Sequence, residues 1–189
     1  MSRMDAIELL LTRTSNGKLS EPGPDEETLQ LAFRAAVRAP DHATLRPWRF
    51  RVVRGAARER LGEVFRDALR AREPDAGDAA LDKAASKPLR APVIIVVAAR
   101  VREHPKVPEV EQLLSAGAAA QNIMLAMHAR GFAGIWRTGA PAYDDAVKRA
   151  LGLGEDERIV GFLYAGTPTA PTPDIRRPDP EAVVEEWTG

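Results

Sequence analysis

Seven consecutive apolar residues in the middle of the chain, Val93 to Ala99, restrict the possible folds more than any other feature. The first five, Val93 to Val97, are β-branched, and Pro92 stands immediately before them. β-Branched residues favour strands, and a strand without polar positions is covered on both faces. The run is far shorter than the roughly 20 residues that cross a bilayer as a helix. We therefore predict a central strand of a sheet, buried on both sides.

Periodic segments on either side predict the other elements. Apolar spacing of three and four residues indicates helices over 5–12, 25–37, 58–72 and about 109–130. Asp25 caps the second of these helices, its buried face reads Leu29, Ala32, Phe33, Ala36 and Val37, and Pro40 ends it. Gly131 ends the last helix. Further strands are expected over 49–53, 134–136 and 159–164.

Two segments lack such periodicity. Residues 73–82, rich in Pro, Gly, Asp and Ala, are expected to be the least structured part of the middle. The proline-rich segment from Pro168 onward is expected to be extended and draped over a surface. With about four strands and five or six helices, the pattern predicts an α/β or α+β layout around a central sheet. The length of 189 residues is typical of a single domain, 1–189.

Composition excludes several classes of protein. Lys plus Arg and Asp plus Glu number 27 each, so the chain lacks the basic excess of a nucleic-acid binder or a polybasic membrane protein. Cysteine is absent, which excludes disulfides, thiolate nucleophiles and iron–sulfur ligation. Residues 1–8 contain no apolar core of a signal peptide, so a cytoplasmic location is expected. Arginine supplies 22 of the 27 basic residues, which suits anion recognition but also follows from genome composition.

Standard catalytic motifs are also missing from the sequence. It contains no dinucleotide-binding glycine motif, no P-loop and no Gly-x-Ser-x-Gly nucleophile turn. The three histidines, His42, His104 and His128, lack metal-ligand spacing, so no metal site is expected. The remaining candidates are polar residues at the ends of predicted elements.

The first candidate segment is Arg13-Thr14-Ser15, directly after the first helix. A guanidinium and two hydroxyls suit a phosphate, but an arginine here also suits a helix C-terminus. The second is the loop 38–49, placed between a helix and a strand where binding loops are common. An ordinary explanation is equally available, with His42 solvated and Trp48 filling the edge of the core.

The third candidate segment is Gly134-Ile135-Trp136-Arg137-Thr138-Gly139, a strand that ends in an arginine and a hydroxyl. Ligands of open α/β sheets gather beyond the carboxyl ends of strands. A plain strand-to-helix turn, punctuated by Gly139 and Pro141, explains the same residues.

Together and in this order, the segments resemble the nitroreductase family of FMN-dependent oxidoreductases, and the resemblance covers nearly the whole chain. The matching features are Arg13-x-Ser15, Ala39-Pro40-x4-Leu45-Arg46-Pro47-Trp48-Arg49-Phe50, the small-residue helix 111–130, the segment 131–139 and the closing segment 159–168. Small members of the family also share Arg38-Ala39-Pro40-Asp41-His42 and a His-x-Lys-Val-Pro segment, which reads here His104-Pro105-Lys106-Val107-Pro108.

The resemblance implies a fold, a cofactor and a site. The implied fold is α+β, a three-layer α/β/α sandwich with a central, mostly antiparallel sheet, in an intertwined homodimer with FMN at the interface. Arg13, Thr14 and Ser15 are expected to bind the phosphate and ribityl end of FMN. Trp136, Arg137 and Thr138 are expected to line the cofactor from the same chain, and Arg38 and His42 to approach it from the partner subunit.

The chemistry implied is carried by FMN, so no side chain is expected to be catalytic. NAD(P)H is expected to donate a hydride, and a nitroaromatic, quinone-like or other electron-poor acceptor to receive it, in a ping-pong sequence. Two alternatives stay open on the sequence. One is an FMN-binding storage or delivery module without efficient turnover, and the other is a dimerisation protein that binds no flavin.

Overall fold

The central strand of the computed structural model, β3 (Val93–Arg100), is buried on both faces, which confirms the prediction from the apolar run. The structure describes residues 5–172 and 174–189. Val93, Ile95 and Val97 face one apolar cluster, whereas Ile94 and Val96 face a second cluster on the other side. Residues 93 to 99 are each at most 4% exposed. The sheet therefore needs a covering layer on both faces.

The sheet is antiparallel throughout. β3 pairs with β2 (Trp48–Arg54) along one edge and with β5 (Glu157–Pro168) along the other. β4 (Ala133–Arg137) pairs with the far edge of β5, with Trp136 opposite Leu163. The short strand β1 (Leu19–Ser20), which the sequence does not predict, pairs with the end of β5. The predicted antiparallel central sheet is thus confirmed.

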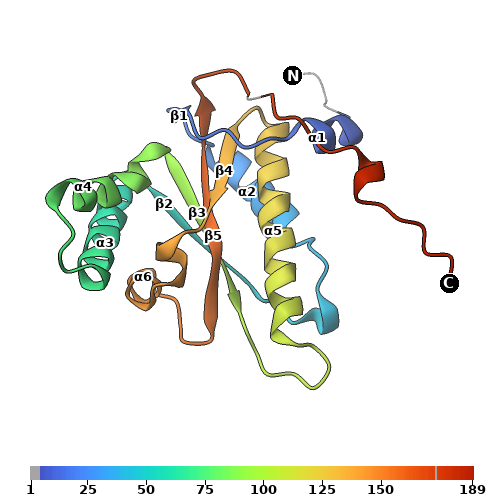
Figure 1. Ribbon diagram of the computed structural model, residues 1–189. Coiled ribbons are helices and arrows are strands. Elements are labelled where there is room, and N and C mark those ends of the chain that lie inside the picture. Colours follow the sequence, from blue (N-terminus) through green and yellow to red (C-terminus); the bar gives the residue numbers. More distant parts are fainter. Residues whose placement is uncertain (1–4, 173) are drawn as a thin grey trace.

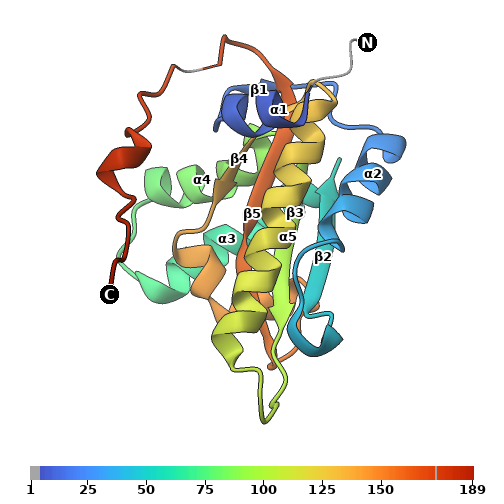
Figure 2. The same ribbon diagram turned by 90° about the vertical axis from the view of Figure 1, so that its right-hand side faces the viewer.

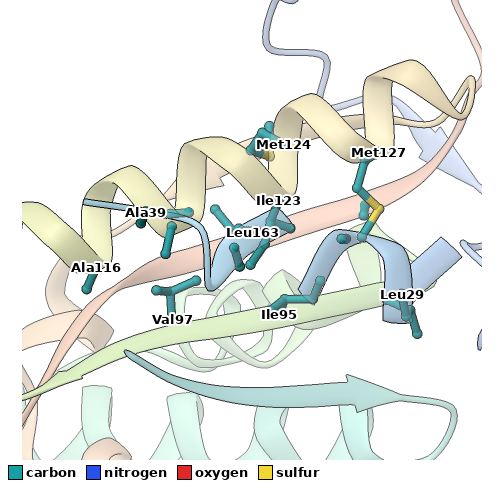
Figure 3. Close-up of a cluster of buried hydrophobic side chains, with 14 of the residues drawn as sticks. Leu29, Ala39, Ile95, Val97, Ala116, Ile123, Met124, Met127 and Leu163 are labelled. Atoms are coloured by element: carbon teal, nitrogen blue, oxygen red, sulfur yellow. The ribbon is translucent and has the colours of Figure 1, made fainter. Parts of the chain in front are cut away.

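Helices form the outer layers. α5 (Glu109–Ala129) and α2 (Glu26–Ala36) cover one face, and Figure 3 shows the core that they bury against β3 and β5. α3 (Ala57–Arg72) and α6 (Asp145–Ala150) cover the opposite face, and α4 (Asp78–Ser86) packs on α3 (Figure 1). The predicted three-layer α/β/α sandwich is confirmed. Within residues 5–172 and 174–189, no helix is long and apolar enough to cross a membrane.

The helix starts follow the predicted caps. The Asp25 carboxylate accepts a hydrogen bond from the Thr28 amide, at 2.8 Å, and so begins α2. Asp5 caps α1 (Ala6–Thr12) in the same way. This helix lies beside the end of α5 (Figure 2). Val37 was expected on the buried face of the second helix, but it follows the last helical residue and is 48% exposed.

The expectation for residues 73–82 is wrong, because α4 begins inside them at Asp78. Gly77 precedes the helix, and the alanines that follow are strong helix formers despite the low apolar content. Leu81 and Ala84 are buried against α3. The contact is so close that a Cβ atom at Gly62 of α3 would collide with the carbonyl oxygen of Ala85. Tertiary packing therefore orders a segment whose composition resembles a loop.

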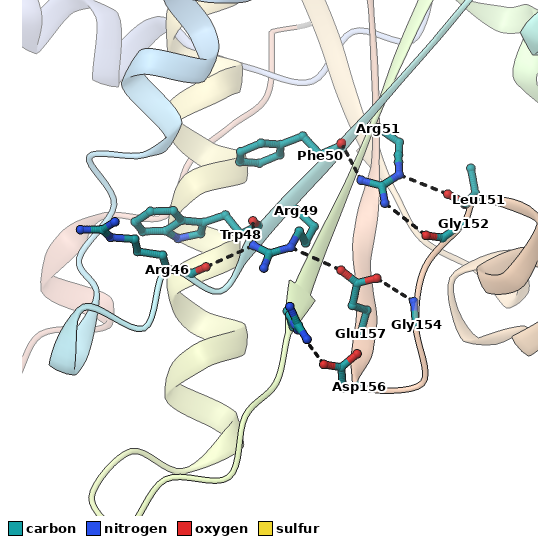
Figure 4. A network of polar contacts seen from close by, with 11 residues as sticks. Arg46, Trp48, Arg49, Phe50, Arg51, Leu151, Gly152, Gly154, Asp156 and Glu157 are labelled. Carbon is teal, nitrogen blue, oxygen red and sulfur yellow. Dashed lines mark hydrogen bonds and ion pairs between the residues drawn. The ribbon is translucent and has the colours of Figure 1, made fainter.

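Many arginines serve structure and not anion binding. Figure 4 shows Arg51 donating to the carbonyl oxygens of Leu151 and Gly152, each at 3.2 Å, where α6 ends. Arg49 approaches the buried carboxylate of Glu157, with Nε 3.5 Å from Oε1. The other oxygen of that carboxylate accepts a hydrogen bond from the Gly154 amide at 2.7 Å. These contacts fasten β2 to the loop that leads into β5.

Replacing Arg49 by alanine is expected to lower the free energy of unfolding by about 2 to 3 kcal/mol, because Glu157, only 7% exposed, would keep a buried charge without its cation. Urea unfolding followed by tryptophan fluorescence measures the change. The control is Arg54→Ala, which breaks the exposed pair with Glu26 and should cost less than about 1 kcal/mol. Equal losses in the two variants would contradict a special role for the buried pair.

The C-terminal segment is extended, as its prolines predict, apart from the short turn η4 (Pro180–Ala182). Its first residues are held by the body of the protein, since the Thr169 amide donates to the Lys18 carbonyl oxygen at 3.0 Å. Residues 174–189 are exposed, and Figure 2 shows them running apart from α5. Within this segment, Arg177 hydrogen-bonds to the loop that carries Arg13 and Thr14.

Candidate functional site

The loop that carries Arg13, Thr14 and Ser15 is fixed by its neighbour Asn16. The Asn16 amide donates to the Gly134 carbonyl oxygen of β4 at 3.0 Å, so the loop extends the free edge of that strand. The buried Asn16 side chain donates to the Ala170 carbonyl oxygen at 3.2 Å and accepts from the Lys18 amide at 3.0 Å. Asn16 therefore sets the position of the three residues before it, a role that the sequence did not reveal.

Arg13 and Thr14 line a narrow cavity between α1, the end of α5 and the start of β4, together with His128 and Thr172. Arg177 reaches back over the loop, and its Nη2 lies 3.3 Å from Thr14 Oγ1 and 3.5 Å from the Arg13 carbonyl oxygen. Burial, and then the charge of Arg177, lower the pKa of Arg13 from its ordinary value. The described residues place no carboxylate within 4.0 Å of Arg13 or Arg177. Uncompensated positive charge of this kind suits an anion.

The strand β4 sends its last two side chains to opposite faces of the sheet. The Trp136 indole nitrogen donates to the Val160 carbonyl oxygen at 3.3 Å, and its ring fills the space left by Gly161 and approaches Gly117 of α5. Arg137 points to the other face, where its guanidinium carbon lies 5.9 Å from the centre of the Tyr164 ring. Trp136 is thus a packing residue as well as a candidate for the cofactor site.

Arg137 and Thr138 open onto a cavity of about 350 Å³. Lys87 and Arg90, from the turn η2 (Lys87–Arg90), add two further cations to its wall. Its other side chains include no carboxylate, and three of them are aromatic: Phe65, Phe162 and Tyr164. Burial, and then the charge of Arg90, lower the pKa of Lys87. Neither Lys87 nor Arg90 was a candidate from the sequence. Their position just before the buried strand was the only signal that could have suggested them.

The loop after Arg13 runs from the narrow cavity towards the larger one. Asn16 lines the narrow cavity, and a Cβ atom at Gly17 would lie 3.1 Å from the guanidinium of Arg137, which lines the larger cavity. A still larger cavity, of about 640 Å³, lies elsewhere, between the start of α5 and α6. Its wall is rich in carboxylates, among them Glu109, Asp144 and Glu155, which gives it the wrong sign for an anionic ligand.

His42 lies far from Arg13 within one chain. His42 Nδ1 is 2.7 Å from Glu111 Oε2 at the start of α5, whereas Arg13 shares a cavity with His128 at the end of α5. Glu111 and His128 are 17 positions apart along α5, which corresponds to roughly 25 Å. His42 and Arg13 therefore lie at opposite ends of α5 within one chain.

The loop around His42 is held in an unusual conformation. Ala43, Thr44 and Arg46 have φ angles of 57°, 52° and 51°, in the left-handed region that costs about 1 kcal/mol or more for each non-glycine residue. Ser115 of α5 secures the loop, because its hydroxyl donates to the Pro40 carbonyl oxygen at 2.6 Å and accepts from the Trp48 indole at 3.0 Å. Trp48 therefore does fill the edge of the core, while the strained turn keeps His42 at the surface.

The sequence profile of the nitroreductase family matches residues 10–167, and the chain belongs to that family. "Putative NAD(P)H nitroreductase YdjA" of Escherichia coli strain K12 is 46% identical over 182 residues, which cover 96% of this chain and 98% of that protein. The protein is thus an oxidoreductase of the NAD(P)H nitroreductase type, from an FMN-binding family.

Solved structures share the fold. The nitroreductase-like family protein from Bacillus cereus superposes with a TM-score of 0.85 at 23% identity, and the match covers 100% of this chain and 99% of that one. A mutant of the FMN and NADPH-dependent nitroreductase NfnB from Sphingopyxis sp. strain HMH gives a TM-score of 0.74 at 24% identity, over 98% of this chain and 100% of that one.

Proposed function

We propose that the protein is an FMN-dependent oxidoreductase that passes a hydride from NAD(P)H to nitroaromatic, quinone-like or related electron-poor acceptors. The observation that carries this proposal is the cavity beside Arg137 and Thr138, which combines cations with aromatic side chains and has no carboxylate in its wall. The relatives support it, because YdjA is named for NAD(P)H and NfnB for FMN and NADPH.

The residues present fit a phosphorylated flavin. Arg13, Thr14 and Ser15 provide a guanidinium and two hydroxyls for the phosphate and ribityl end, and the neighbouring Arg177 adds a second guanidinium. Arg137 and Thr138 would hold the ring end, with Lys87 and Arg90 from η2. Positive charge fixed in a partly dry cavity stabilises an electron-rich ligand without further reorganisation.

Bound FMN supplies hydride transfer from NAD(P)H to a second substrate, which would use the same pocket in turn in a ping-pong sequence. The protein then needs no nucleophile and no metal of its own. Its side chains have to bind the phosphate, orient the ring and keep positive charge near it. This division of work agrees with the lack of a triad in the sequence.

The proposed site is completed by a second copy of the chain. α1 and α5 expose large apolar side chains: Ile7, Leu10 and Leu11 beside the end of α5, and Val110 and Leu114 in its first two turns. The extended segment 174–189 adds Ile175, Val183, Val184 and Trp187, all exposed. A homodimer built on this surface would cover these side chains. It would also bring Arg38 and His42 to the partner's cofactor, as the family resemblance implies.

Spectroscopy and kinetics test the proposed function together. The purified protein is expected to bind FMN, to lose the flavin absorbance when NADPH or NADH is added, and to regain it when a nitroaromatic or quinone is added. Flavin that is bound but not reduced by either nucleotide would indicate a storage or delivery module. A protein that ignores added FMN would contradict both functions. Initial rates with both nucleotides and a panel of acceptors would identify the substrates.

The dimer gives a separate prediction. Leu114→Asp places a charge at the centre of the exposed α5 surface, and it is expected to weaken self-association roughly 30-fold or more, the loss typical of a central interface residue. Sedimentation velocity measures the monomer–dimer equilibrium. Ala79→Asp, on the exposed side of α4 in the opposite layer, is the control and should leave the dimer intact. A Leu114→Asp protein that remains dimeric would place the interface elsewhere.

A further inference from the structure

His128 lies in the same narrow cavity as Arg13 and Thr14, in the last turn of α5. Its Nε2 is 3.1 Å from Thr12 Oγ1. The Thr12 hydroxyl has a single proton, and it donates that proton to the Glu8 carbonyl oxygen at 2.7 Å. The hydroxyl oxygen must therefore accept from His128, so Nε2 carries the hydrogen and Nδ1 has the lone pair in the neutral ring.

The charged groups around His128 are almost all cations. The charge of Arg13, the residue after α1, acts on the ring directly, and Arg177 from the C-terminal segment contacts the Arg13 carbonyl oxygen. Arg130, the residue after α5, is paired with Glu27, with Nη2 3.4 Å from Oε1. Glu8 offers only its carbonyl oxygen, through Thr12. The side chains that β4 and the C-terminal segment contribute to the cavity are uncharged.

These surroundings keep His128 neutral in the free protein. Burial, and then the charge of Arg13, lower the pKa of His128 from its ordinary value of 6.5. A neutral ring has no second hydrogen to donate, whereas a protonated ring donates from both nitrogens. A bound dianion would favour the protonated ring, because its negative charge offsets the positive charges around the cavity.

We propose that His128 is an additional ligand of the FMN phosphate, one that binds the phosphate only in its protonated form. The proposal rests on the proposed function, because it requires that FMN occupies the cavity beside Arg13. Neither the family resemblance nor the candidate segments of the sequence pointed to this residue.

The proposal predicts the direction of a pH effect. The phosphate raises the pKa of His128 on binding, so the complex takes up a proton from solution. The affinity for FMN therefore rises as the pH falls through the interval between the lowered pKa of the free protein and the raised pKa of the complex. Riboflavin lacks the phosphate and should show no such rise.

The experiment is a titration of the flavin-free protein with FMN and with riboflavin at about pH 8 and about pH 5.5, on either side of the ordinary histidine pKa. Flavin fluorescence gives the dissociation constants. Between the two pH values, the ratio of FMN affinity to riboflavin affinity should rise about tenfold more in the native protein than in His128→Gln, since one unit of pKa shift is a factor of ten. Titration of the FMN phosphate itself affects both proteins equally and cancels.

His104→Gln is the matched control, because His104 belongs to the loop before α5 and only accepts from the Lys106 amide. It should behave as the native protein does. Calorimetry in two buffers of different ionisation enthalpy should show proton uptake on FMN binding in the native protein and less in His128→Gln. Identical pH dependence in the native protein and His128→Gln would overturn the proposal while leaving the FMN site intact. A protein that binds neither flavin would instead overturn the proposed function, and this inference with it.

Discussion

Arg13→Ala is expected to weaken FMN binding roughly 10- to 150-fold, since a charge-assisted hydrogen bond contributes about 1.5 to 3 kcal/mol. Arg13 is partly buried, and the described residues give it no carboxylate partner, so its charge is available to a phosphate. Its side chain follows the last turn of α1 and supports no strand. The substitution should therefore leave the fold and the dimer intact.

The test compares FMN with riboflavin, each titrated into the native protein and Arg13→Ala. Loss of affinity for FMN alone, with riboflavin unchanged, is the expected pattern. Arg34→Ala, on the exposed side of α2, controls for the general loss of a positive charge. Unchanged FMN affinity in Arg13→Ala would remove this residue from the phosphate site, and equal losses for both flavins would indicate damage to the fold.

A large effect on stability is also expected of Gly161→Ala. A Cβ atom at this position would come within 2.6 Å of Trp136 Cδ1, with the indole packed directly over the glycine. The indole cannot move outward freely, because Gly117 of α5 lies on its other side and its nitrogen bonds Val160. Overpacking of this kind costs about 1 to 3 kcal/mol, which corresponds to a fall in Tm of very roughly 2–12 °C for a chain of this size.

Thermal unfolding measures the effect, and Gly77→Ala is the control. Gly77 has a φ angle of −70° and open space around its Cα, so alanine fits there with a change of at most about 0.5 kcal/mol. The near-ultraviolet circular dichroism of Gly161→Ala should also change, because Trp136 is displaced. A variant as stable as the native protein would mean that the indole has another position available.

Much of the fold could be predicted because each element carries a local signal. The β-branched run fixed β3 as the buried centre, and Asp25 and Gly131 marked the ends of long helices. α4 was missed because its short alanine-rich sequence has no apolar stripe, and only the close approach of α3 explains it. β1 has two residues and takes its conformation from the end of β5.

The sequence likewise predicted one part of the candidate site and missed another. The segments around Arg13, His42 and Arg137 were candidates from the residues alone. The family resemblance assigned their roles toward FMN, and these roles remain predictions. Lys87 and Arg177 could not be found from spacing, because each reaches the site from a distant part of the chain. The arginine excess was a poor guide, since Arg49 and Arg51 serve carbonyl oxygens and a buried carboxylate.

The contacts of Asn16 determine when the site can form during synthesis. Asn16 and Ala170, whose hydrogen bond holds the loop after Arg13, are 154 positions apart in the sequence. On the ribosome, chains fold from the N-terminus at roughly 5 to 20 residues per second, so the loop emerges long before its last partner. The proposed phosphate-binding end of the site can therefore be completed only after Ala170 has been made.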